Sequence, residues 1–127
     1  MSTAAQLVQR LNHGVRASTA KWRFVAERPF GDALRLRRFV LGNGLTVVTV
    51  VDRTAPTVSY HSWFAVGSRY ERPGKTGLAH FFEHMMFGET ENHPLGEFDH
   101  LMEASGAEAN AATWTDWTYY YENAPKS

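Results

Sequence analysis

The sequence predicts an α+β fold with a mostly antiparallel sheet, and three observations support this prediction. Two β-rich runs flank a Gly-Asn-Gly turn, and Asn-Gly is among the strongest short hairpin signals. Two later segments carry apolar or aromatic side chains at alternate positions, as strands do. Two segments with helical features lie between them. The hairpin comprises residues 38–41 and 45–51, the alternating segments are residues 57–66 and 107–121, and the helical segments are residues 77–88 and 94–105.

Residues 1–35 are expected to form an N-terminal extension, and residues 36–127 a domain. Within the extension, residues 4–11 are predicted to form a short amphipathic helix, and no acidic residue occurs before Glu27. A basic segment with scattered Ser and Thr is also typical of organelle transit peptides. It equally fits an extension that packs on the domain or one that stays loose. We expect a cytoplasmic protein and keep organelle targeting as the alternative.

Composition restricts the remaining classes of protein. The 127 residues are enough for one small domain with a hydrophobic core. Lys plus Arg equals Asp plus Glu, at 13 each, so no basic field indicates a nucleic-acid partner. The chain has no cysteine, which excludes disulfides and thiolate metal ligands. No apolar run approaches the roughly 20 residues of a membrane-spanning helix, so no membrane span is expected.

The stretch G-L-A-H-F-F-E-H-M-M-F-G, residues 77–88, is apolar at nearly every position except three titratable ones. A helix that is apolar on almost all sides is typically buried, so we expect a buried helix of about three turns. Thr76 is its expected N-cap and Gly88 its expected end. Burying His80, Glu83 and His84 without partners would cost several kcal/mol, so something must compensate them.

His80 and His84 are four residues apart, so they lie on one face of the helix and can bind one metal ion. Glu83 lies at the margin of that face, where it can reach a water on the metal without being a ligand. Zn²⁺ suits this set, because imidazole nitrogen is among its usual ligands and a catalytic site keeps one position for water. The metal lowers the pKa of that water to about 7, and a nearby carboxylate can take its proton. The alternative is a pair of packed histidines with a carboxylate on the helix surface; the spacing within an apolar helix favours the metal.

The spacing H-x-x-E-H is the inverse of H-E-x-x-H and is the signature of the inverzincins. Around it, residues 67–90 resemble the pitrilysin/insulinase family of zinc metallopeptidases, which includes the mitochondrial processing peptidases. Upstream, N-G-L-T-V at residues 43–47 resembles the first hairpin of that family, and downstream N-A-A-T-W-T-D-W-T-Y at residues 110–119 resembles its N-A-x-T segment. The resemblance covers about residues 38–125. By themselves, the loop charges Arg69, Glu71 and Arg72 could be solvated or could support the site; the resemblance favours structural support by the G-S-R-x-E segment.

The resemblance implies a zinc-dependent metalloendopeptidase with helices packed on one face of its sheet. His80 and His84 would bind Zn²⁺, and Glu83 would be the catalytic residue that activates the zinc-bound water for hydrolysis of a peptide bond. Asn110 and Ala111 would lie on an edge strand that receives a peptide or unfolded polypeptide substrate as an added strand.

In that family the third zinc ligand is a glutamate well downstream, on another helix, and no residue of this chain matches its motif. We therefore expect the N-terminal portion of a peptidase domain, truncated before the third ligand, that acts with a second half-domain or a partner subunit. The isolated chain is expected to be inactive or nearly so. Because the family includes inactive subunits, the alternative is a non-catalytic peptide-binding or assembly module.

Overall fold

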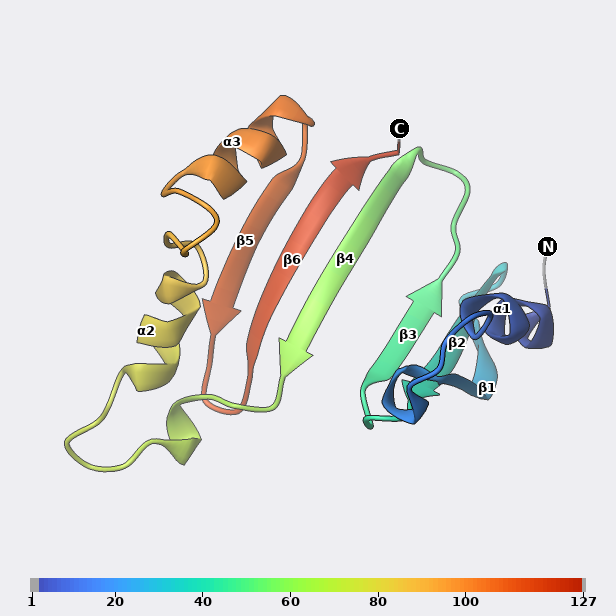
Figure 1. Ribbon diagram of the computed structural model, residues 1–127, viewed down its shortest axis with the longest axis horizontal. Coiled ribbons are helices and arrows are strands. Elements are labelled where there is room, and N and C mark those ends of the chain that lie inside the picture. Colours follow the sequence, from blue (N-terminus) through green and yellow to red (C-terminus); the bar gives the residue numbers. More distant parts are fainter. Residues whose placement is uncertain (1–2, 127) are drawn as a thin grey trace. The chain divides into compact units, whose positions relative to one another are not determined.

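Figure 1 shows the computed structural model, which describes residues 3–126. The chain divides into two compact units, Met1–Ala55 and Pro56–Ser127. Each unit contains one three-stranded antiparallel sheet. No helix among the described residues is long and apolar enough to cross a membrane.

The first unit has the strand order β1-β2-β3 and two short helical elements before the sheet. Leu41 N–H donates to the Leu45 carbonyl at 2.9 Å across the turn, and Gly44 has a φ of +92°, which residues with a side chain rarely adopt. The predicted hairpin is therefore confirmed. The elements are α1 (Ala4–Leu11), the 3₁₀ helix η1 (Ser18–Ala20), β1 (Trp22–Phe30), β2 (Leu34–Leu41) and β3 (Thr46–Val50).

An aromatic cluster forms the core of the first unit. Phe39 of β2 is 1% exposed, and its ring centroid lies 5.7 Å from that of Phe24 and 6.2 Å from that of Trp22, both on β1. The Asn12 side chain, at the end of α1, accepts from the Trp22 N–H and donates to the Trp22 carbonyl, which fixes α1 to β1. The sequence pattern does not predict β1, and the division at residue 35 stays a prediction.

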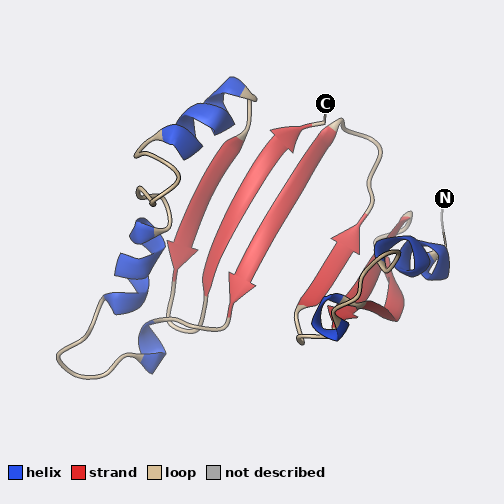
Figure 2. Ribbon diagram, in the orientation of Figure 1, coloured by secondary structure: helices blue, strands red, loops and turns tan. Residues whose placement is uncertain are grey.

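The second unit is a sheet with the order β4-β6-β5 and two α-helices (Figures 1 and 2). Both predicted helices and the three predicted strands are present, each with boundaries shifted by a few residues. The elements are β4 (Thr57–Phe64), the 3₁₀ helix η2 (Ser68–Tyr70), α2 (Leu78–Met85), α3 (Glu97–Ala104), β5 (Glu108–Thr113) and β6 (Thr118–Pro125).

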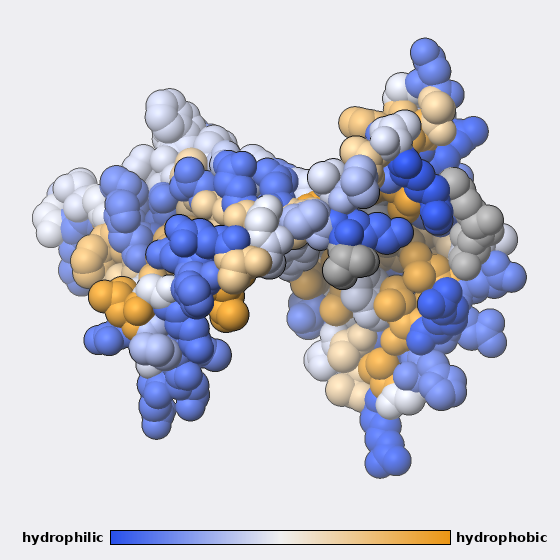
Figure 3. Space-filling model, turned by 90° about the horizontal axis from the view of Figure 1, so that it is seen from above, coloured by the Kyte–Doolittle hydropathy of each residue, from blue (hydrophilic) through white to orange (hydrophobic). Residues whose placement is uncertain are grey.

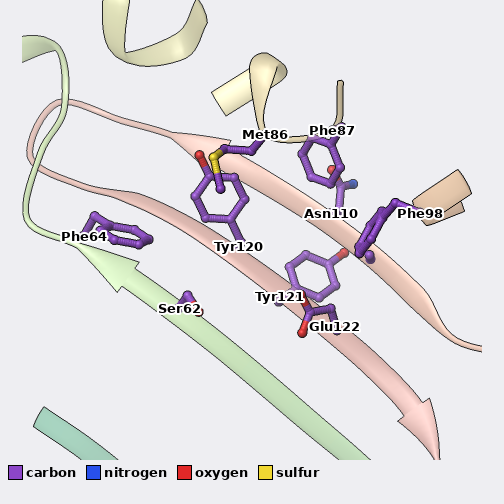
Figure 4. A pocket seen from close by; sticks show the side chains of 10 residues that line it. Ser62, Phe64, Met86, Phe87, Phe98, Asn110, Tyr120, Tyr121 and Glu122 are labelled. Atoms are coloured by element: carbon purple, nitrogen blue, oxygen red, sulfur yellow. The ribbon is translucent and has the colours of Figure 1, made fainter. Parts of the chain in front are cut away.

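The helices of this unit pack on one face of its sheet. Phe87, directly after α2, lies with its ring centroid 5.9 Å from that of Phe98 on α3 and 6.1 Å from that of Tyr120 on β6. Figure 4 shows Phe87 and Phe98 above the strands, over an apolar pocket. The other face carries stacked aromatics, with Trp63 and Tyr119 at 4.5 Å. The predicted α+β class, with helices on one face of an antiparallel sheet, is confirmed.

The expectation of a buried α2 is wrong. Phe81, Phe82 and Met85 are more than half exposed, and apolar side chains reach the molecular surface in Figure 3. The reason is that α2 packs against β5, β6 and η2, which leaves much of its surface uncovered within the described part of the chain. Glu83, which contacts the end of β5, is the one buried residue of the helix.

The start of α2 is also not the predicted one, because Gly77 and not Thr76 occupies the N-cap position. The Glu71 carboxylate, from the preceding loop, accepts hydrogen bonds from the backbone N–H groups of Gly77 (2.7 Å) and Ala79 (2.8 Å). A negative charge here also complements the positive end of the helix dipole. These hydrogen bonds lower the pKa of Glu71, and the one from Ala79 has the largest effect. Glu71 therefore supports the start of α2. The helix C-cap is Met86, so the helix also ends before the predicted Gly88.

The loop before α2 is attached to the β5–β6 turn. The N–H groups of Ser68 and Arg69 donate to the carbonyls of Trp114 (3.1 Å) and Thr115 (2.9 Å). Gly67 lies so close to this turn that a Cβ atom would be 2.2 Å from the Trp114 carbonyl oxygen. Only glycine fits at this approach, whatever its φ angle.

Gly67→Ala is expected to destabilise the second unit by about 1–3 kcal/mol, because the added methyl group must displace backbone atoms of the β5–β6 turn. Urea unfolding followed by tryptophan fluorescence measures the change, and Ser68→Ala, at the neighbouring exposed position, is the control. An unfolding midpoint equal to that of the wild type would contradict the close approach.

Glu71→Gln is expected to reduce the dependence of stability on pH. A carboxyl group whose folded-state pKa is lowered stabilises the fold above its usual value of 4.5, and this contribution is lost as the pH falls through the folded-state pKa. The unfolding free energy of the wild type should therefore fall more than that of the variant between about pH 6 and about pH 3. Urea unfolding across this pH range measures the difference, and Glu89→Gln in the exposed loop is the control. Identical pH profiles of the unfolding free energy for the wild type and Glu71→Gln would contradict the capping role of Glu71.

Candidate metal centre

The rings of His80 and His84 converge beside α2, and both side chains are exposed. Their Nε2 atoms lie 3.0 Å apart, and their ring centroids are 4.6 Å apart. The arrangement follows from the helix, which places residues four apart on one face. Both side chains are exposed, so solvent and ions reach the two nitrogens.

The two histidines fit zinc as part of a ligand set. Zinc binds imidazole nitrogen at about 2.0–2.1 Å in tetrahedral geometry, which separates two such nitrogens by about 3.3 Å. The observed 3.0 Å is close to that separation. A direct N–H···N hydrogen bond between two neutral rings also fits this distance. Among residues 3–126, no group of three or more His, Cys, Asp or Glu side chains gathers as a metal site would require, so His80 and His84 would be an incomplete ligand set.

Glu83 lies beside the histidines in sequence but faces the sheet. It is 8% exposed, and its Oε2 atom accepts a hydrogen bond from the Thr113 hydroxyl at the end of β5. The sequence pattern does not single out Thr113. The available signal was its place as the last residue of the N-A-A-T segment, three residues after Asn110.

A second threonine stands behind this contact. Thr118, the first residue of β6, is opposite Thr113 in the strand register, and their Oγ1 atoms are 3.3 Å apart. The Thr118 hydroxyl donates to the Val66 carbonyl at 3.0 Å. The pKa of the nearby Tyr120 phenol is raised by its burial and, to a lesser extent, by the negative charge of Glu83. Glu83 thus sits among hydroxyl groups at the end of the sheet.

Asn110 and Ala111 lie on β5, which is at one edge of the three-stranded sheet within residues 56–126. They pair with Tyr121 and Tyr120 of β6. The N–H of Ala111 donates to the side-chain Oδ1 of Asn110 at 2.8 Å, so this backbone donor is occupied by its own strand. The position on an edge strand agrees with the prediction; the role in substrate binding stays a prediction.

An open cavity of about 280 Å³ adjoins this cluster, between the start of α2 and the β5–β6 turn. It brings His80 and Thr113 to the same opening, whereas the pocket in Figure 4 lies over β6 and contains neither histidine. The cavity residues are Ser68, Glu71, Gly77, His80, Thr113, Trp114 and Thr115.

Three curated relatives are informative. The zinc protease PqqE of Helicobacter pylori is 40% identical over 82 residues, which are 64% of this chain and 18% of the relative. The uncharacterized zinc protease YmxG of Bacillus subtilis is 33% identical over 86 residues, 68% of this chain and 21% of the relative. The probable mitochondrial-processing peptidase subunit beta of Arabidopsis thaliana is 37% identical over 81 residues, 64% of this chain and 15% of the relative.

Solved structures agree with this fold. A protease from Helicobacter pylori has a TM-score of 0.67 at 36% identity, over 71% of this chain and 22% of that protein. Pitrilysin has a TM-score of 0.70 at 26% identity, over 82% of this chain and 12% of that protein. The chain therefore spans about a fifth, or less, of the length of the relatives it matches.

The family follows from a match that includes the site. Residues 46–127 match the family model described as Insulinase (Peptidase family M16), and this range contains the H-x-x-E-H helix, Thr113 and the whole second sheet. Together with relatives named zinc proteases and a pitrilysin-like fold, this match shows that the chain belongs to the pitrilysin/insulinase family of peptidases, family M16.

Proposed function

We propose that this chain contributes to a zinc-dependent metalloendopeptidase in which His80 and His84 bind the metal and Glu83 is the catalytic base. One observation carries the proposal: the two ring nitrogens converge to 3.0 Å on the helix that also holds the buried Glu83. Membership of a family whose relatives carry zinc protease names supports it. The third ligand would come from outside residues 3–126, from the rest of the protein or a partner subunit.

The chemistry assigns a distinct task to each group. Zinc, when bound, supplies Lewis acidity to the peptide carbonyl and to the attacking water. The histidines would hold it through their converging Nε2 atoms. Thr113 holds Oε2 of Glu83, and Oε1 would accept a proton from the attacking water and pass it to the leaving amine. The open cavity beside His80 provides room for the scissile bond.

The substrate would be an extended peptide or an unfolded polypeptide. An edge strand binds such a chain through backbone hydrogen bonds, with little dependence on its side chains. On β5 the peptide would pair near Asn110 and Ala111. Since the Asn110 side chain occupies the Ala111 N–H, a peptide carbonyl would have to take the place of Oδ1.

A second candidate is a non-catalytic peptide-binding or assembly module of the same family. It is favoured by the lack of a third metal-binding side chain near the histidines within residues 3–126. In that case β5 would still bind peptide, and substitution of His80 or Glu83 would leave peptide binding unchanged. Zinc binding and cleavage measured together separate the two functions.

His80→Ala and His84→Ala are each expected to weaken zinc binding by at least about tenfold, because each removes one of the two imidazole ligands that this part of the chain supplies. Competition with a chromophoric chelator measures the affinity. His100→Ala, an exposed histidine on α3, is the matched control. Equal affinity in all three variants and the wild type would remove both histidines from the ligand set.

Glu83→Gln in the full-length protein is expected to keep stoichiometric zinc and to lose cleavage by about 10²–10⁴-fold, since the amide cannot accept the proton. Cleavage of an unfolded polypeptide and metal analysis are measured on the same samples, with Glu103→Gln on the exposed side of α3 as the control. Undiminished turnover in Glu83→Gln would rule out Glu83 as the base. Absence of cleavage by the wild-type protein would favour the binding module.

A further inference from the structure

We propose that Thr113 is a positioning residue: its hydroxyl fixes the Glu83 carboxylate, and Thr118, its partner in the strand register, anchors the adjoining chain through the Val66 carbonyl. This inference rests on the proposed role of Glu83 as catalytic base. It adds a residue to the site that the H-x-x-E-H pattern does not contain.

The Glu83–Thr113 contact is partly buried within the second unit. Glu83 and Thr118, at 8% and 7% exposed, are the buried polar residues of the part of the chain that the structure describes. Both belong to one connected group, in which Thr113 lies between them. A buried carboxylate is costly unless it is hydrogen-bonded. The Thr113 hydroxyl meets that need, so the contact has a reason to persist.

The direction of the hydrogen bonds distinguishes the two oxygens of Glu83. An ionised carboxylate only accepts hydrogen bonds, and a hydroxyl has one proton to donate. Thr113 therefore donates its proton to Oε2 of Glu83. The Thr118 Oγ1 atom is 3.0 Å from the Val66 carbonyl oxygen and 3.3 Å from Thr113 Oγ1. The carbonyl is therefore the preferred acceptor of the Thr118 proton. One oxygen of Glu83 is thus committed, and Oε1 is the oxygen left for the reaction.

Thr113 stands on a rigid part of the sheet. Thr113 is β-branched, which restricts its χ1 angle, and it pairs with Thr118 at the closed end of β5 and β6. The Trp114 N–H donates to the Trp117 carbonyl at 2.8 Å and closes the turn between these strands. A threonine at this place can therefore hold a carboxylate in one orientation.

The position of Thr113 on β5 has a consequence for catalysis. Asn110 and Ala111, the proposed peptide-binding residues, precede it on the same strand. The strand β5 therefore determines both the path of the bound peptide and the position of the proposed base, Glu83. A change at Thr113 should disturb the chemical step while leaving peptide binding largely intact.

The test compares Thr113→Val, which removes the hydroxyl at nearly constant shape, with Thr113→Ser, which keeps it. In the full-length protein, Thr113→Val should lower kcat by about 10²-fold with KM changed by less than about threefold, because the base is no longer held in place. Thr113→Ser should stay within about fivefold of the wild type. Zinc content should be unchanged in both. Thr57→Val, on the exposed part of β4, is the matched control.

A measurement without metal or substrate complements the kinetics. In the zinc-free chain, three-bond NMR couplings report the χ1 rotamer of Glu83. We expect one rotamer in the wild type and Thr113→Ser, and averaged couplings in Thr113→Val. If valine prevents folding, Thr113→Ala removes the same hydroxyl and carries the same expectation.

The outcomes separate this inference from the proposed function. If Glu83→Gln is inactive while the hydroxyl-free variants keep wild-type kcat and a single Glu83 rotamer, the positioning role is wrong and the catalytic base stands. If Glu83→Gln remains active, the proposed function fails, irrespective of Thr113. A serine variant as impaired as the valine variant would also overturn the role of the hydroxyl.

Discussion

The hydrogen bond between Glu83 and Thr113 is the contact on which the arrangement of this site depends. The apolar side chains of α2 are largely exposed, so hydrophobic burial contributes little to the position of this helix within the described chain. Two carboxylates contribute instead. The Glu71 carboxylate accepts hydrogen bonds from N–H groups at the start of α2, and Glu83, within α2, accepts one from Thr113 at the end of β5. The two contacts are one and a half turns apart, which restrains both the place and the rotation of α2.

Exposed apolar side chains on α2 have a physical meaning of their own. Monomeric proteins rarely expose large contiguous apolar surfaces, and such surfaces usually mark contacts with other chains or segments. Phe81, Phe82 and Met85 are each more than half exposed. A cover for this face fits the proposed need for a second half-domain or partner subunit, which would also supply the missing metal ligand. Completing the metal site and covering the helix would then be one event.

Much of the fold could be predicted because its signals are local. The Gly-Asn-Gly turn specifies the β2–β3 hairpin, and alternating aromatics specify β6. The strand β1 could not be predicted in this way, since it contains Pro29 and an irregular register between Phe24 and Ala26 and owes its state to pairing with β2. The sequence pattern places the N-cap of α2 at Thr76, directly before the helix, whereas the capping carboxylate belongs to Glu71, six residues before Gly77. The contact of Thr113 with Glu83 spans 30 residues, and no spacing rule reports it.

The candidate site shows the same division between local and distant information. His80, Glu83 and His84 share one helix, so the helix repeat alone fixes the separation between the proposed metal ligands and the proposed base. Asn110, Ala111 and Thr113 share one strand, which fixes the separation between a bound peptide and the hydroxyl. What neither repeat determines is the distance from helix to strand. The Glu83–Thr113 hydrogen bond sets that distance, and under the proposed function it therefore brings the peptide, the base and the metal into one reaction geometry.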